Sequence, residues 1–140
     1  MNKITSDKTA TDIFIDGASR GNPGESGIGI LFINEENLDF KKYIGTGTNN
    51  NAEYTALITA LEIALNSKLL NIKIHTDSLL VANQVNGSWK VKDPDIKALY
   101  LRAKSLIEKF EDFSITHVRR EYNSEADRLA NEAINEYFNK

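Results

Sequence analysis

The sequence DIFIDGASRGNPGESGIGILFI, residues 12–33, predicts the start of a β-sheet. Residues 12–15 and 28–33 are largely apolar and rich in β-branched side chains, whereas residues 21–24 (GNPG) are all turn formers. Apolar runs bounded by such residues are typical of buried strands joined by tight turns. The stretch therefore predicts two neighbouring strands, the first of which ends at Asp16.

The patterns beyond this hairpin indicate an α/β fold. From residue 52 to residue 65, apolar residues recur at the spacing of three and four that marks a helix. The elements expected after the first two strands are a turn at 34–37, a strand at 38–44, a helix at 52–65, a strand at 72–77, helices at 78–85 and 93–110, a strand at 115–118 and a helix at 124–138. The order βββαβααβα predicts a five-stranded mixed sheet, an antiparallel meander of strands 1, 2 and 3 plus parallel strands, flanked by helices.

The size and composition are those of one domain. Of the 140 residues (15.7 kDa), we expect 1–10 to be a frayed terminus and 11–140 to be a single domain. The net charge of −3 argues against a protein that coats nucleic acid or membranes through bulk positive charge. Apolar runs are too short for a secretory signal or a membrane span, so we expect a cytoplasmic protein with no membrane contact.

The available residue types restrict the chemistry. The chain has no cysteine, which excludes disulfides, thiolate metal sites and a cysteine nucleophile. With only two histidines, His75 and His117, a histidine-rich zinc site is not expected. Oxygen ligands and hard cations remain for a hydrolase.

Four carboxylates occupy the ends of predicted elements. Asp16 and Asp77 end predicted strands, and Glu53 and Asp127 lie in the first turns of helices, on the stripes expected to face the core. A carboxylate in such a place costs several kcal/mol unless a partner compensates its charge. A divalent cation shared by the four side chains would do so.

Each acid also has a purely structural explanation. Asp16 could be a turn residue and Asp77 could cap the following helix. Glu53 and Asp127 could each be the third residue of a capping box, begun by Asn50 and Ser124 respectively. Spacing alone leaves both explanations open and names no reaction.

Four sequence blocks resemble those of the type 1 ribonucleases H. In order along the chain they are DGASRGNPG at 16–24, TNNNAE at 48–53, TDS at 76–78 and NSEADRLA at 123–130. The resemblance implies a ribonuclease H-like fold and an endonuclease that cuts the RNA strand of an RNA–DNA hybrid, leaving 5′-phosphate and 3′-hydroxyl ends. No obligate protein partner is evident, and we expect a monomer.

The resemblance also implies a metal site. By motif position, Asp16, Glu53, Asp77 and Asp127 are the catalytic, metal-binding carboxylates, with Asp16 as the bridge between two ions. Two Mg²⁺ ions suit an all-oxygen site in phosphodiester hydrolysis, with Mn²⁺ as a substitute. Asp127 is expected to be the member most easily lost with partial activity.

Substrate contacts follow from the same motifs. The positions that match substrate-binding residues are Ser19, Asn22, Thr48, Asn49, Asn50, Trp89, Lys90 and Lys92. The asparagines match minor-groove contacts, where 2′-hydroxyls distinguish RNA from DNA. Thr48 matches a contact to a DNA-strand phosphate, and the segment from Trp89 to Lys92 matches the region that grips that strand.

The sequence departs from the best-studied bacterial members before the last helix. Residues 118–123 run almost directly into that helix, so the family's flexible loop is shortened and its histidine has no counterpart, as in the archaeal and plant-like branch. His117 is expected to be a packed or edge residue of the fifth strand. In the bacterial members the loop histidine assists proton transfer or product release, and Arg120 or Glu121 would take over this role here. We expect weaker, more salt-sensitive binding with intact chemistry.

The same residues allow other functions. A ribonuclease H-like module that is catalytically weak or silent and binds nucleic acid or a protein is the main alternative. A 3′→5′ exonuclease is disfavoured because its usual Asp-x-Glu is absent: Gly17 and Ala18 follow Asp16. An actin-like phosphate loop needs two such domains, and this chain has room for one.

Overall fold

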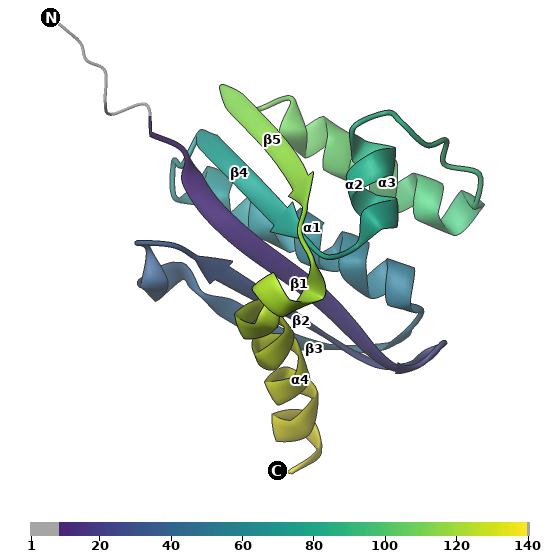
Figure 1. The fold of residues 1–140 in the computed structure, drawn as a ribbon. Helices are drawn as coiled ribbons and strands as arrows, with labels where there is room; N and C mark the ends of the chain where they lie inside the picture. Colours follow the sequence, from purple (N-terminus) through teal and green to yellow (C-terminus); the bar gives the residue numbers. More distant parts are fainter. Residues whose placement is uncertain (1–8, 140) are drawn as a thin grey trace, which may run out of the picture.

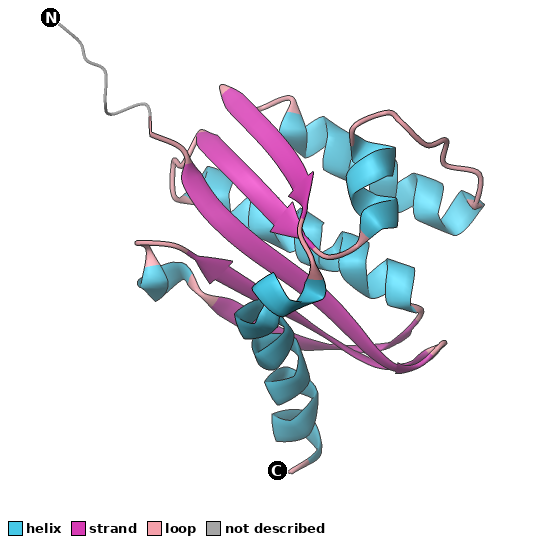
Figure 2. Ribbon diagram, in the orientation of Figure 1, coloured by secondary structure: helices cyan, strands magenta, loops and turns pink. Residues whose placement is uncertain are grey.

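The computed structural model describes residues 9–139, which form a five-stranded sheet with helices on both faces (Figures 1 and 2). The order of strands across the sheet is β3-β2-β1-β4-β5. The elements are β1 (Thr11–Gly21), β2 (Gly24–Phe32), η2 (Glu36–Leu38), β3 (Phe40–Gly47), α1 (Asn49–Asn66), β4 (Asn71–Thr76), α2 (Leu79–Val85), α3 (Pro94–Ile107), β5 (Asp112–His117), η3 (Arg120–Tyr122) and α4 (Ser124–Phe138). The predicted fold class and element order are confirmed.

The predicted hairpin is present, but its first strand is longer than expected. β1 and β2 pair antiparallel as far as Gly21 opposite Gly24, so the turn lies where the GNPG sequence indicates. On its other side β1 pairs with the parallel strand β4 only from Thr11 to Ile15. The prediction that β1 ends at Asp16 is therefore wrong, because pairing with β2 carries the strand five residues further.

Helices cover the two faces of the sheet unequally. α1 packs on β1 and β2 and is backed by α3, whereas α4 crosses the opposite face over β2, β3 and β1 (Figure 1). Alternate residues of β1 and β2, such as Ile13, Ile15, Ile28 and Ile30, are fully or almost fully buried. The apolar stripe of α1 that the sequence predicts, including Leu57, packs against them.

Several element boundaries differ from the predictions. The turn predicted at 34–37 overlaps the short helix η2, which extends to Leu38, and β3 begins at Phe40 rather than at residue 38. β5 spans Asp112–His117 rather than 115–118. Residues 1–8 of the predicted frayed terminus lie outside the described residues, and Thr9 and Ala10 precede the first strand. Among the described residues, no helix has the length and apolar character needed to cross a membrane.

Candidate metal centre

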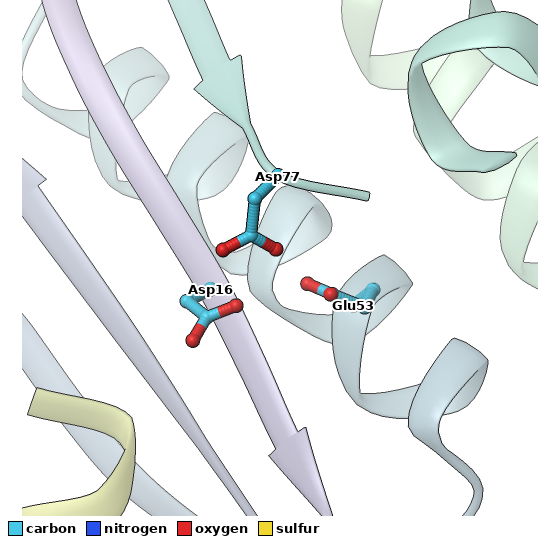
Figure 3. Close-up of side chains that lie close together, drawn as sticks. All are labelled: Asp16, Glu53 and Asp77. Carbon is cyan, nitrogen blue, oxygen red and sulfur yellow. The ribbon is translucent and has the colours of Figure 1, made fainter. Parts of the chain in front are cut away.

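Three acidic side chains from three different elements point toward one another (Figure 3). Asp16 lies in the middle of β1, Asp77 directly follows β4, and Glu53 belongs to the first turns of α1. One carboxylate oxygen of each lies within 4.8 Å of the others. Because β4 ends at Thr76 while β1 continues, the end of β4 leaves room for this cluster beside β1.

The cluster is buried and consists of carboxyl groups that lie close to one another. Asp16 and Glu53 are each only 4% exposed. Burial, and next the charges of Glu53, Asp77 and Asp127, raise the pKa of Asp16 to about 10. Burial is also the main cause that raises the pKa of Glu53 to about 8, although the Gly17 N–H and the positive charge of Arg120 oppose the shift.

This donor set fits a divalent cation. The oxygens converge on one place, and their mutual repulsion would be relieved by a positive charge between them. Hard oxygen ligands of this kind are those that Mg²⁺ and Mn²⁺ take in proteins. The residues present therefore suit the cation that the sequence motifs imply.

Asn123 supports the cluster from the start of α4. It is 1% exposed, and its Nδ2 donates to the Ile15 carbonyl at 2.9 Å and to Asp77 Oδ2 at 3.2 Å. Its Oδ1 is buried without a hydrogen-bond partner among the described residues. Asn123 is the first residue of the fourth sequence block, but the block predicted no role for it. The structure shows that it ties Asp77 to β1.

Asp127 lies at the rim of the cluster rather than on the core face of α4. It lines the same cavity as the three acids, and its charge contributes to the raised pKa of Asp16 and of Glu53. The expectation that it faces the core is wrong, because the buried side of α4 is formed by its neighbour Ala126, with Ala130 and Ile134, and Asp127 itself is exposed. Asn131 Nδ2 lies 3.3 Å from its Oδ1.

The structural explanations for the four acids do not hold. Thr48 caps α1 in a capping box with Asn51, and Ser78 caps α2 by accepting a hydrogen bond from the Val81 N–H. At α4 the N-cap is Asn123, without a side-chain capping bond. Asp16 lies within a strand rather than in a turn. None of the four acids therefore caps a helix or forms a turn.

Some of the predicted substrate residues lie beside the acids. Ser19 and Asn49 line the same cavity. Asn22 Oδ1 accepts a hydrogen bond from the Asn49 N–H at 3.0 Å, which joins the β1–β2 turn to the start of α1. Asn50 is half-buried in the first turn of α1, and the Thr48 hydroxyl is occupied in the capping box.

The other predicted residues lie on two exposed segments. Trp89, Lys90 and Lys92 are exposed between α2 and α3, with 45% of Trp89 accessible. Arg120 lines the acidic cavity. The neighbouring Glu121 instead pairs with Arg119 at 3.0 Å on the surface.

The predicted location of His117 is confirmed. This residue is exposed at the end of the edge strand β5.

Comparisons with known proteins find a matching family model and similar relatives. A family model described as "Reverse transcriptase-like" matches residues 14–133. Ribonuclease HI of Halobacterium salinarum is 44% identical over 126 residues, which cover 88% of this chain and 63% of that protein. The crystal structure of RNase H1 from the same archaeon superimposes with a TM-score of 0.87 at 42% identity, covering 91% of this chain and 99% of the other.

A further solved structure holds a nucleic acid. LC11-RNase H1, isolated from compost, was crystallised in complex with an RNA/DNA hybrid. It has a TM-score of 0.83 and 37% identity to this chain, covering 91% of this chain and 99% of the other.

Proposed function

The chain belongs to the ribonuclease HI family, and from this membership we propose that it is an endonuclease that hydrolyses the RNA strand of RNA–DNA hybrids, leaving 5′-phosphate and 3′-hydroxyl ends. The observation that carries the proposal is the convergence of Asp16, Glu53 and Asp77 within 4.8 Å in a buried, acidic place. A relative of 37% identity bound to an RNA/DNA hybrid supports the choice of substrate.

The acidic side chains would hold the catalytic ions. Asp16, Glu53 and Asp77 supply the converging oxygens, and Asp127 adds a carboxylate from the rim of the cavity. Two bound Mg²⁺ ions, or Mn²⁺ in their place, would supply activation of water and stabilisation of the leaving oxygen. The hydrogen bonds from the Gly17 N–H to Glu53 and from Asn123 to Asp77 hold these ligands in place without adding charge.

Several of the residues that would bind substrate lie beside this site. Ser19, Asn22 and Asn49 lie where β1, its turn and α1 meet, next to the acids, and Asn50 follows on α1. Amide side chains both donate to and accept from a 2′-hydroxyl, which selects RNA over DNA. Thr48 Oγ1 accepts the capping hydrogen bond from the Asn51 N–H, and the Thr48 N–H donates to Asn51 Oδ1. The hydroxyl hydrogen of Thr48 would therefore be the group that donates to a DNA phosphate.

The exposed segment between α2 and α3 would contact the DNA strand. Trp89 offers an indole for packing on sugar, and Lys90 and Lys92 offer positive charge for phosphates. Because these are few cations on a chain of net charge −3, we expect hybrid binding to be weak and salt-sensitive.

Arg120 would replace the loop histidine of bacterial members. The connection from β5 to α4 is residues 118–123, which contain no histidine, and this supports an assignment to the shorter archaeal and plant-like branch. Arg120 lines the acidic cavity, whereas Glu121 is paired with Arg119. Of the two candidates, the geometry therefore favours Arg120, as a cation that orients a phosphate.

Cleavage of matched duplexes tests the proposal. RNA–DNA, RNA–RNA and DNA–DNA duplexes of one sequence are incubated with the protein in Mg²⁺, in Mn²⁺ and in a chelator, and product ends are mapped. We expect internal cuts in the RNA of the hybrid with either metal and none with chelator. Hybrid binding without cutting would instead support a silent binding module.

A further inference from the structure

A buried polar pair connects α1 to the segment that carries Trp89. Tyr54 is fully buried, and its hydroxyl donates to Gln84 Oε1 at 2.7 Å. Gln84, on α2, is 6% exposed, and its Nε2 donates to the Lys90 carbonyl at 3.4 Å. The amide of Gln84 thus bridges the interior of α1 and the backbone of an exposed segment.

The two ends of this bridge lie next to functional positions. Tyr54 directly follows Glu53 of the acidic cluster, and Lys90 directly follows Trp89. The start of the segment is held by backbone hydrogen bonds, because the Ser88 and Trp89 N–H groups both donate to the Asn83 carbonyl. Beyond Trp89, the Gln84 amide reaches the Lys90 carbonyl before the half-buried Val91.

Buried polar groups of this kind favour a single arrangement. A hydroxyl or amide removed from water costs free energy unless it is hydrogen-bonded, so conformations that break the bridge are disfavoured. An apolar pair of the same size would fill the same space, but it would form no hydrogen bond that holds the Lys90 carbonyl in one position. The bridge therefore does more than fill the core.

We propose that Tyr54 and Gln84 are positioning residues that fix the segment from Trp89 to Lys92 relative to the acidic cluster, and so set the affinity for the DNA strand of the hybrid. The inference rests on the proposed function, since it assigns the pair to hybrid binding. The two side chains act through the backbone of Lys90 and touch no substrate themselves.

The single tryptophan of the chain makes the proposal testable without substrate. Trp89 fluorescence and its quenching by acrylamide report the exposure and mobility of the segment directly. The variants are Tyr54→Phe, Gln84→Met and the double variant, in which two apolar side chains face each other. Thr55→Val is the matched control, because it removes a hydroxyl from α1 that donates to the Asn51 carbonyl at 2.7 Å, a bond within the same helix.

We expect each single variant to increase quenching of Trp89 and to raise the KM for hybrid about fivefold, the value of one hydrogen bond. The kcat is expected to stay within about twofold, since the acids are not displaced. Thr55→Val should change neither quantity. A merely structural role would lower the melting temperature and leave both the quenching and the KM unchanged.

The outcomes separate this inference from the proposed function. If the wild type fails to cut hybrids, the function is wrong, whereas the quenching still tests whether the pair fixes the segment. If all three folded variants retain the wild-type quenching and KM, Val91 and the backbone bonds suffice and the positioning role is overturned. The double variant keeps the test valid should an unpaired polar group unfold either single variant.

Discussion

The backbone N–H of Gly17 donates to Glu53 Oε1 at 2.9 Å, across 36 residues of sequence. This bond joins β1 to α1 beside Asp16 and orients one of the three converging carboxylates. The approach is possible because position 17 has no side chain: a Cβ there would lie 2.2 Å from the Ala52 carbonyl carbon. A single glycine therefore allows the sheet and the helix to bring two acids together.

Gly17→Ala should destabilise the protein by about 3 kcal/mol, since the added methyl group pushes α1 away from β1. Urea denaturation followed by circular dichroism measures the change. Gly47→Ala is the control: its Cβ would lie 3.6 Å from Asn51 Cβ, an ordinary contact, and it should cost less than about 1 kcal/mol. Equal stability of the two variants would contradict this explanation of the close approach.

Asp16→Asn should abolish cleavage and stabilise the metal-free protein. Cleavage should fall by at least about a hundredfold, because metal ions contribute several kcal/mol to the transition state. The melting temperature without metal should rise, since the substitution removes an acid from a cluster whose members repel one another. Hybrid cleavage and thermal unfolding in chelator measure the two effects. Cleavage at the wild-type rate by this variant would contradict the assignment of Asp16 as a ligand of the catalytic ions.

Asp127→Asn should have a smaller effect than Asp77→Asn. Asp127 is exposed at the rim and outside the set of oxygens that converge within 4.8 Å. We expect a loss of about tenfold in kcat, because a carboxylate at the rim supports the ions less directly than the three converging carboxylates do. Single-turnover cleavage of one hybrid by both variants measures the difference, and an equal or larger loss for Asp127→Asn would contradict the rim position.

The stability of the metal-free protein should fall as the pH rises. In the folded state burial raises the pKa of Asp16 from 3.8 to about 10 and that of Glu53 from 4.5 to about 8. The folded protein therefore holds more protons than the unfolded chain between about pH 5 and pH 8, and the free energy of unfolding decreases across that window. The stabilising protonation is fully present below the unfolded values and is lost as the pH rises through the folded ones.

Urea denaturation in chelator at several pH values measures this slope. Mg²⁺ should flatten it, since the cation stabilises the ionised acids in the folded state. Asp16→Asn should also flatten it. Stability that is constant or rising over the same range in chelator would show that the acids ionise freely in the folded protein.

Lys90→Ala and Lys92→Ala should each weaken hybrid binding and lower the slope of log affinity against log salt by about one. Fluorescence anisotropy of a labelled hybrid in chelator measures binding at several salt concentrations. Lys109→Ala is the matched control, because Lys109 is an exposed lysine just past the far end of α3, roughly 20 Å along the helix from the segment. An unchanged slope for both variants would exclude phosphate contacts by this segment.

The sequence predicts the fold class and the order of the elements well because both depend on local patterns. The GNPG turn and the helical spacing after residue 52 are local, and they identify the hairpin and α1. The extent of β1 is different, because it depends on which strand pairs on each side. Pairing with β4 stops at Ile15 and pairing with β2 continues, which no pattern within 12–33 reveals.

The orientation of single side chains was the less predictable part of the site. The apolar stripe of α4 admits either Ala126 or Asp127 on its margin, and neighbouring helix positions differ by about 100°. Ala126 is the residue that faces the sheet, because Gly29 has no side chain and lets β2 approach the Ala126 carbonyl oxygen closely. The role of Asn123 depends on contacts with Ile15 and Asp77, which are distant in sequence and meet only in the folded protein.

The most direct test of the metal centre is calorimetric titration of Mn²⁺ into the metal-free protein, for the wild type and for the Asp16→Asn/Glu53→Gln double variant. Circular dichroism first verifies that both are folded. We expect saturable binding heat for the wild type and none for the double variant. Equal binding by both proteins would contradict the assignment of these buried carboxylates as the ligands of the catalytic ions.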